Sequence, residues 1–171
     1  NYLSFRSPTA LLWLVVSLKM TKIKLVAWDV YGTIIADYKD ETTDNESSNI
    51  LQLRHGVLEA LIEINSRKIL QCTCSDGDLG NLKNNLREAG IIWKDYFIDL
   101  YKMNPGEQKD FLYLIEEYKL KPENLLIIGD NYDIDIALAK KQGCETLWVP
   151  KKDSLNVKSI LKFLVWINIL F

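Results

Sequence analysis

Five short apolar segments, rich in β-branched residues, alternate with longer amphipathic segments between residues 23 and 149. Segments of this length and composition are typical of buried strands. They comprise residues 23–28, 69–74, 96–101, 125–128 and 146–149. Helical periodicity occupies the stretches between them, over residues 56–67, 78–89, 108–118 and 134–142. The alternation predicts an α/β fold: a three-layer, Rossmann-like, parallel five-stranded sheet with right-handed crossovers and helices on both faces.

Length, charge and cysteine content narrow the class of protein. The chain has 171 residues, which suits one domain with its own core. Its net charge of −2 leaves no broad basic field, so we do not expect it to bind nucleic acid. Its three cysteines cannot all pair, which favours a reducing compartment, and we expect a cytoplasmic protein.

Both ends of the chain are apolar and stand apart from the alternating pattern. We divide the sequence into an extension of doubtful status at residues 1–19, a core at 20–152 and a C-terminal helical or apolar tail at 153–171. The run at residues 10–18 is too short to span a bilayer, and we expect an upstream or non-native extension, with a signal or anchor as the alternative. The run at 160–171 is expected to pack on the core, with an interfacial anchor as the alternative, so membrane association is not the first expectation.

Polar and charged side chains follow the predicted strands at their carboxyl ends. In an open parallel sheet these ends meet at one edge, where ligands bind. The fold would therefore gather distant carboxylates, a hydroxyl and a lysine into one site. The candidate residues are Asp29, Ser75, Asp76, Lys109, Asp130, Asp133 and Asp135. Clustered carboxylate oxygens suit Mg²⁺ and an anionic substrate.

The same residues carry a resemblance to a known family. The stretches Asp29-x-Tyr31-Gly32-Thr33 and Gly129-Asp130-x-x-Asp133-x-Asp135, with the turn at Ser75 and the lysine at Lys109, resemble the four motifs of the haloacid dehalogenase superfamily. Most members of that superfamily are phosphatases. The resemblance covers residues 23–150, and it implies the superfamily's parallel sheet and a phosphorylated substrate.

The resemblance implies a role for each group that handles the phosphoryl moiety. Asp29 would be the nucleophile and would form an aspartyl-phosphate. Lys109 would neutralise the nucleophile and the transferring group. Lys102, directly after the third strand, is the alternative lysine; Lys109 is favoured because we expect it to open a helix. Ser75 would hydrogen-bond a phosphoryl oxygen, and Asp76 beside it is assigned to substrate binding, with a plain turn residue as the alternative.

The resemblance also implies a Mg²⁺ cofactor. Asp29, Asp130 and the backbone carbonyl of Tyr31 would hold the metal. Asp135 would complete the metal site by orienting the water shell of the ion, with Asp133 as a further candidate for that task.

Tyr31 departs from the pattern of the phosphatases, which have a second aspartate two residues after the nucleophile. A phenol with a pKa near 10 is a poor general base at neutral pH, so turnover would be slow or restricted to good leaving groups. Two alternatives stay open: a catalytically weak phosphoryl-binding or scaffold protein, and a 2-haloacid dehalogenase, whose halide leaves without a proton.

The spacing of the motifs leaves no room for a sizeable cap domain. Only 41 residues separate Thr33 from Ser75, and the stretch at residues 37–49 is acidic and polar. That composition does not suit an apolar pocket for a halo-acid. A capless site would be open, which suggests by analogy a phosphorylated substrate as large as a macromolecule.

Overall fold

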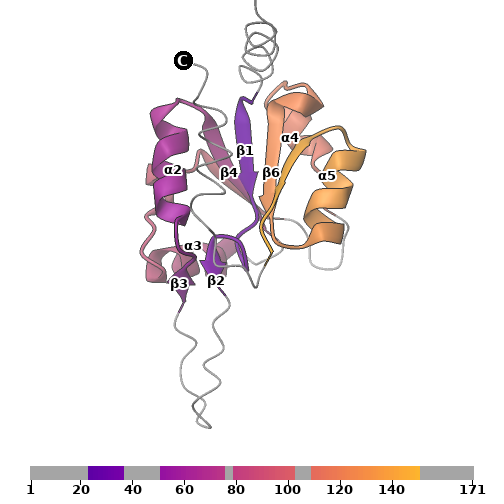
Figure 1. The fold of residues 1–171 in the computed structure, drawn as a ribbon. Helices are drawn as coiled ribbons and strands as arrows, with labels where there is room; N and C mark the ends of the chain where they lie inside the picture. Colours follow the sequence, from indigo (N-terminus) through magenta and orange to yellow (C-terminus); the bar gives the residue numbers. More distant parts are fainter. Residues whose placement is uncertain (1–22, 37–50, 76–78, 103–108, 151–171) are drawn as a thin grey trace, which may run out of the picture.

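The computed structural model describes residues 23–36, 51–75, 79–102 and 109–150, and every structural statement below refers to these residues (Figure 1). Five parallel strands form one sheet in the order β5-β4-β1-β6-β7. The strands are β1 (Leu25–Trp28), β4 (Leu70–Ser75), β5 (Asp99–Lys102), β6 (Leu125–Gly129) and β7 (Glu145–Trp148). The predicted parallel five-stranded α/β fold is confirmed.

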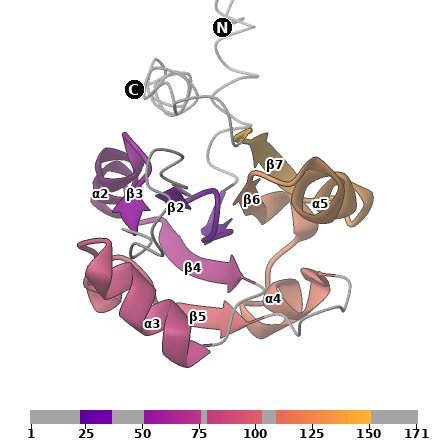
Figure 2. The same cartoon turned by 90° about the horizontal axis from the view of Figure 1, so that it is seen from below.

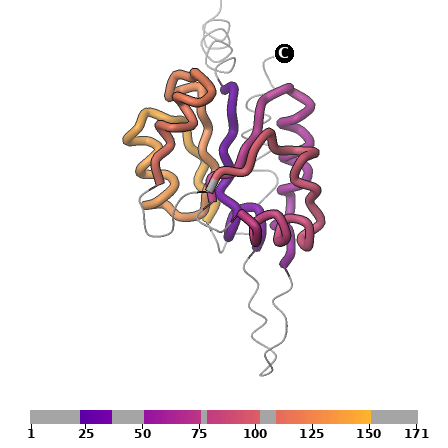
Figure 3. The backbone as a smooth tube through the Cα atoms, turned by 180° about the vertical axis from the view of Figure 1, so that it is seen from behind, coloured from indigo at the N-terminus to yellow at the C-terminus, as the bar shows by residue number. Residues whose placement is uncertain are grey.

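Helices cover both faces of the sheet. One face carries α2 (Val57–Ser66) and α3 (Leu79–Glu88), and the other carries α4 (Leu112–Glu117) and α5 (Leu138–Lys141), as Figure 2 shows from below. From behind, β1 runs between these two pairs of helices (Figure 3). The 3₁₀ turns η1 (Trp93–Asp95) and η2 (Pro122–Asn124) precede β5 and β6, and the π-helical turn η3 (Tyr132–Ala137) leads into α5.

The alternation of side chains along the strands gives the molecule two hydrophobic cores. Val26 and Trp28 of β1 pack with apolar residues of α2 and α3 in the first core. Leu25 and Ala27 face the other way and pack with residues of α4 and α5 in the second core. Asp29 follows β1 directly. It therefore lies at the carboxyl edge of the sheet, at the end of the central strand, all of whose residues are buried.

A small antiparallel pair of strands, which the sequence pattern did not predict, stands beside the sheet. It consists of β2 (Ile35–Ala36) and β3 (Gln52–Leu53). Strands of two residues are too short for the alternation of polar and apolar residues to be recognised. Between Thr33 and Ser75 the described chain forms only this pair, α2 and the strand β4 that ends at Ser75, in keeping with the expectation of no sizeable cap.

Three predicted boundaries were wrong. The strand predicted at residues 96–101 is β5 at Asp99–Lys102, because η1 and the buried Phe97 occupy the approach to it. The helix predicted at 108–118 is the shorter α4, and the helix predicted at 134–142 begins earlier, as η3. Side-chain acceptors near Phe111 and at Asn131 bind backbone N–H groups and set these starts.

None of the helices in the described parts of the chain is long and apolar enough to cross a membrane. The predicted extension at residues 1–19 and the tail at 153–171 lie outside the described residues.

Phe111 and its neighbour Leu112 provide a test of the second core. Phe111 is fully buried, whereas Leu112 is 44% exposed. We expect Phe111→Ala to lower the free energy of unfolding by about 3–5 kcal/mol, and Leu112→Ala to change it by less than about 0.5 kcal/mol. Urea denaturation followed by circular dichroism measures both values. Equal losses in the two variants would contradict this placement of the segment.

Candidate active site

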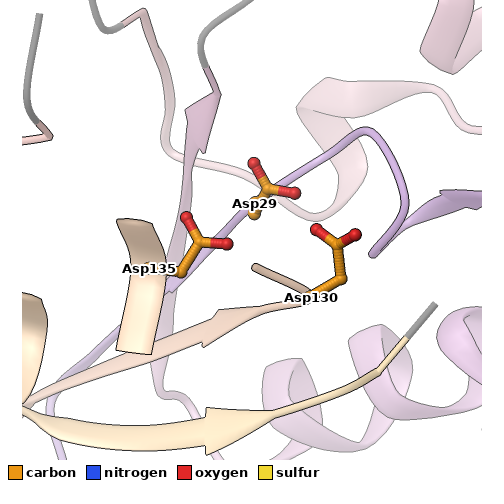
Figure 4. Close-up of side chains that lie close together, drawn as sticks. All are labelled: Asp29, Asp130 and Asp135. Atoms are coloured by element: carbon orange, nitrogen blue, oxygen red, sulfur yellow. The ribbon is translucent and has the colours of Figure 1, made fainter. Parts of the chain in front are cut away.

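Three carboxylates converge at the carboxyl edge of the sheet. Asp29 follows β1, Asp130 follows β6, and Asp135 projects from η3 (Figure 4). One oxygen of each lies within 4.8 Å of the corresponding oxygens of the other two. The side chains are 7%, 9% and 1% exposed respectively, so the charges are largely withdrawn from water.

Lys109 places its ammonium group among these carboxylates. Its Nζ donates to Oδ1 of Asp29 at 2.9 Å and to Oδ1 of Asp135 at 2.7 Å, and the side chain is 2% exposed. Ion pairs that are buried and hydrogen-bonded hold both partners firmly, because separating them would leave a buried charge uncompensated. Lys102, the alternative lysine, is the last residue of β5.

Lys109 does not open a helix, contrary to the sequence prediction; it lies three residues before α4. The turn that carries it is held instead by Gln142, whose Oε1 accepts from the N–H of Phe111 and whose Nε2 donates to Oδ1 of Asp110. Asp110 also accepts from the N–H of Leu112. The rigidity of the lysine therefore comes from side-chain hydrogen bonds around its turn.

Thr33 links the first carboxylate to the second. Its hydroxyl lies 3.1 Å from Oδ2 of Asp29 and 3.5 Å from Oδ1 of Asp130, in a fully buried position. Gly32 precedes it with a φ of 84°, a left-handed conformation that favours glycine. The conformation of Gly32 thus forms the turn that places the hydroxyl group of Thr33 next to the two aspartates.

Gly129 makes room for Asp135. A Cβ atom at position 129 would lie 2.4 Å from Oδ2 of Asp135, so any larger residue would displace that carboxylate. The N–H of Asn131 donates to the same Oδ2 at 3.1 Å. The side chain of Asn131 meanwhile caps η3 by accepting from the N–H groups of Asp133 and Ile134. Both oxygens of Asp135 therefore accept hydrogen bonds from the protein.

Burial and charge shift the pKa values of the cluster. Burial raises the pKa of Asp29 from 3.8 to about 7; Lys109 opposes the shift, and the neighbouring carboxylates reinforce it. Burial likewise raises the pKa of Asp135, again against the effect of Lys109. Burial would lower the pKa of Lys109, but the thiol of Cys74 and the carboxylates of Asp29 and Asp135 raise it above its ordinary value. The lysine is thus charged at neutral pH.

The cluster fits a divalent cation. Three carboxylates against one ammonium leave a formal excess of two negative charges. Carboxylate oxygens are hard ligands of the kind that Mg²⁺ prefers. Their mutual separation of up to 4.8 Å is close to the roughly 4 Å between opposite ligands of Mg²⁺.

The other predicted site residues lie around this centre. Ser75 is the fully buried last residue of β4, the strand beside β1, and so stands at the same edge. Asp76 lies outside the described residues. Tyr31 is half-buried against the first core, and its phenol oxygen accepts from Nδ2 of Asn85 in α3 at 2.8 Å. Asp133 is exposed in η3.

Sequence reasoning missed two polar residues near the centre. The sequence motif predicted no separate role for Thr33, although its position after Asp29-x-x-Gly is consistent with the hydroxyl contact. Nothing in the sequence pattern indicated a buried position for Arg54. It is 6% exposed and donates to backbone carbonyls of three distant residues. An arginine before a helix gives no signal of burial, because the residue type is usually exposed.

Comparison with known proteins places these features in context. A family model described as haloacid dehalogenase-like hydrolase matches residues 36–143. That range contains Lys109, Asp130 and Asp135, whereas Asp29 precedes it. No curated protein matches the chain.

Solved structures share the fold at low sequence identity. A haloacid dehalogenase-like family hydrolase from Xanthomonas campestris is 12% identical, with a TM-score of 0.65 and coverage of 87% of this chain and 98% of its own. A predicted phosphoglycolate phosphatase from Haemophilus somnus is 16% identical, with a TM-score of 0.65 and coverage of 85% and 99%. A haloacid dehalogenase family enzyme from Bacteroides thetaiotaomicron, in complex with magnesium and inorganic phosphate, is 15% identical, with a TM-score of 0.61 and coverage of 78% and 98%.

The raised pKa of Asp29 predicts a pH dependence of stability in metal-free protein. Because the folded state binds this proton more tightly than the unfolded state, the contribution is complete below about pH 4 and is lost as the pH rises towards 7. We expect Tm to fall from pH 5 to pH 8, and to fall less in Asp29→Asn. Thermal unfolding in chelator measures the difference.

Asp95→Asn is the matched control, because Asp95 is an exposed carboxylate in η1. It should reproduce the pH dependence of the unaltered protein. The same fall of Tm in Asp29→Asn and in the control would contradict the assignment to Asp29.

Proposed function

The chain belongs to the haloacid dehalogenase-like hydrolases, and on that premise we propose that it is a Mg²⁺-dependent phosphatase whose nucleophile is Asp29. The observation that carries the proposal is the ammonium of Lys109, which Asp29 and Asp135 share beside Asp130. Catalysis of phosphoryl transfer is almost entirely positioning and electrostatic stabilisation. A buried cation beside a buried carboxylate nucleophile supplies both.

The reaction divides into two displacements at phosphorus. A carboxylate oxygen of Asp29 attacks the phosphorus atom, and the bond from phosphorus to the leaving oxygen breaks. The leaving oxygen keeps the electron pair and takes a proton from solvent, while an aspartyl-phosphate remains on the protein. Water then attacks the same phosphorus, loses a proton to solvent and displaces Asp29. Inorganic phosphate leaves, and the carboxylate is restored.

The chain's own donors hold the charge during these steps. Lys109 neutralises Asp29 before the attack and the phosphoryl oxygens during it. The hydroxyl of Thr33 donates to Asp29, and it can turn to donate to Asp130 once Asp29 carries the phosphoryl group. Ser75 at the end of β4 donates to a phosphoryl oxygen, and we assign Asp76, which follows it in the sequence, to substrate binding.

We assign the metal to Asp29, Asp130 and the backbone carbonyl of Tyr31. When bound, Mg²⁺ supplies the positive charge that neutralises the oxygens of the transferring phosphoryl group. Asp135 acts indirectly, because Lys109 and the N–H of Asn131 already occupy its two oxygens. It fixes the lysine and orients the waters of the metal. The magnesium and phosphate in the Bacteroides thetaiotaomicron relative support this assignment by analogy of fold.

Tyr31 determines which leaving groups are acceptable. Its phenol is bound by Asn85 and its ring packs against the first core, so it is fixed towards α3. A phenol fixed in this direction does not replace an aspartate as a proton donor to the leaving oxygen. We propose that the enzyme acts on phosphates with good leaving groups, such as aryl phosphates and acyl phosphates.

The site admits large substrates. The described chain between Thr33 and Ser75 forms only the β2–β3 pair, α2 and β4, and 14 residues of the interval (37–50) lie outside the described chain. Such a short insertion supports the proposal that a phosphorylated macromolecule can reach Asp29.

All three cysteines are buried free thiols, which supports a cytoplasmic location.

Tyr31 also favours a second candidate function, a phosphoryl-binding protein with little turnover. Such a protein would form a stable adduct with beryllofluoride and would not hydrolyse aryl phosphates. The third hypothesis, dehalogenation, requires release of chloride from 2-chloropropionate in the presence of a chelator.

Substitution of the nucleophile tests the proposed phosphatase. We expect turnover of p-nitrophenyl phosphate with Mg²⁺, its loss in chelator, and a loss of at least about 10³-fold in Asp29→Asn, since covalent catalysis requires the carboxylate. Release of p-nitrophenolate measures the rate. Asp95→Asn should keep the full rate. Undiminished turnover in Asp29→Asn would exclude this mechanism.

A general acid introduced at Tyr31 should broaden the substrate range. We expect Tyr31→Asp to increase kcat/KM for an alkyl phosphate such as β-glycerol phosphate by up to about 10²-fold. For p-nitrophenyl phosphate, whose leaving group needs no proton, the change should be small. Tyr31→Phe, which removes only the phenol oxygen, serves as the control and should show no gain. Equal changes for both substrates in Tyr31→Asp would refute this account of leaving-group selection.

A further inference from the structure

Arg54 is a buried cation that the phosphatase mechanism does not use. It lies between β3 and α2 and is 6% exposed. Its own backbone is fixed, because its N–H donates to the carbonyl of Ile34 at 2.9 Å and its carbonyl accepts from the N–H of Val57 at 3.1 Å. A buried guanidinium group costs free energy unless its donors are bonded, so the bonds it makes indicate what it does.

The guanidinium group joins two segments that are far apart in sequence. Nη1 donates to the carbonyl oxygen of Gly32 and, at 3.0 Å, to that of Val149. Nη2 donates to the carbonyl oxygen of Pro150. A planar, forked donor can bind several carbonyls at once, which a lysine cannot do with the same geometry. Arg54 thereby binds the turn after Asp29 to the segment that follows β7.

That segment is bound in turn to the second carboxylate-bearing turn. The N–H of Val149 donates to the carbonyl of Gly129 at 2.9 Å. The indole Nε1 of Trp148 donates to the carbonyl of Asp130 at 3.0 Å. A continuous chain of hydrogen bonds therefore runs from Gly32 through Arg54 and the end of β7 to Asp130.

We propose that Arg54 and the end of β7 position the nucleophile turn and the Asp130 turn relative to each other. Gly32 lies between Tyr31, whose carbonyl we assign to the metal, and Thr33, whose hydroxyl contacts Asp29 and Asp130. Fixing the Gly32 carbonyl fixes the peptides on either side of it. Arg54 is thus a positioning residue that touches no reacting atom. The inference rests on the proposed function for its catalytic consequence, although the link itself is independent of it.

Amide hydrogen exchange in metal-free protein tests the link without any reference to activity. The N–H of Gly32 donates to the carbonyl of Ile35 at 2.8 Å, and that of Thr33 to Val30 at 3.3 Å. We expect Arg54→Lys and Arg54→Met to exchange these two amides at least about tenfold faster, with the amides of β1 unchanged. Arg67→Met is the control, because Arg67 pairs with Glu63 within the same helical segment, away from the turn.

Mg²⁺ titration and kinetics then test the catalytic consequence. Loss of a residue that orients ligands typically weakens metal binding by about 10–100-fold. We expect the Mg²⁺ dissociation constant, measured by calorimetry, to rise by about that factor in Arg54→Met and by less in Arg54→Lys. With p-nitrophenyl phosphate, kcat should fall while KM changes little. A purely structural residue would lower Tm without this division between kcat and KM.

Unchanged exchange at Gly32 and Thr33 in folded Arg54 variants would overturn the inference, as would Mg²⁺ affinity within twofold of the unaltered protein. If neither Arg54 variant folds, Trp148→Phe decides, because it removes the donor to the Asp130 carbonyl and keeps an aromatic ring at a position that is 50% exposed. Weaker Mg²⁺ binding in that variant supports the inference, and unchanged binding overturns it. Absence of Mg²⁺ binding and turnover in the unaltered protein would instead contradict the proposed function, and the exchange data would still test the link.

Discussion

The ammonium of Lys109 shared between Asp29 and Asp135 is the interaction on which the rest of the site depends. It joins three separate elements: the end of β1, the turn before α4 and η3. All three side chains are largely buried, so none can be left without a partner at small cost. Removing the lysine would leave three carboxylates facing one another in a medium that screens charge poorly. The lysine therefore holds this edge of the sheet together.

Glycines lie near this interaction at positions where a larger residue would clash with a neighbouring side chain or could not adopt the backbone conformation. Gly129 has no side chain because Asp135 fills the space where a Cβ would stand. The turn around Gly32 takes a left-handed conformation, and Thr33 then reaches back to both aspartates. The motif residues are thus linked by packing and by hydrogen bonds, and a change at one of them would shift the others.

Much of the fold and of the charged centre could be predicted from the sequence, because both follow from periodicity and from strand ends. Buried strands give long apolar signals, and parallel strands bring their carboxyl ends together, so Asp29 and Asp130 could be placed at one edge. The start of α4 could not be predicted, since it depends on Gln142, a residue about thirty positions further along the chain. The role of Arg54 could not be predicted for the same reason. Its partners are backbone carbonyl groups of distant residues, and every residue type has such a group, so the sequence does not identify them.

The side chains around the site come from both faces of the sheet, and those from each face differ in kind. Lys109 and Asp135 reach the centre from the side of α4 and α5, and they supply its charge. Tyr31, bonded to Asn85 of α3, and Arg54, between β3 and α2, lie on the other side. The first group is tightly coupled, because every member is paired with another buried charge. The second group is linked to the centre through the backbone of the turn after Asp29, which carries Tyr31 and whose Gly32 carbonyl accepts from Arg54. This separation gives a physical reason why the buried charged centre can be kept in a chain that has a tyrosine two residues after Asp29.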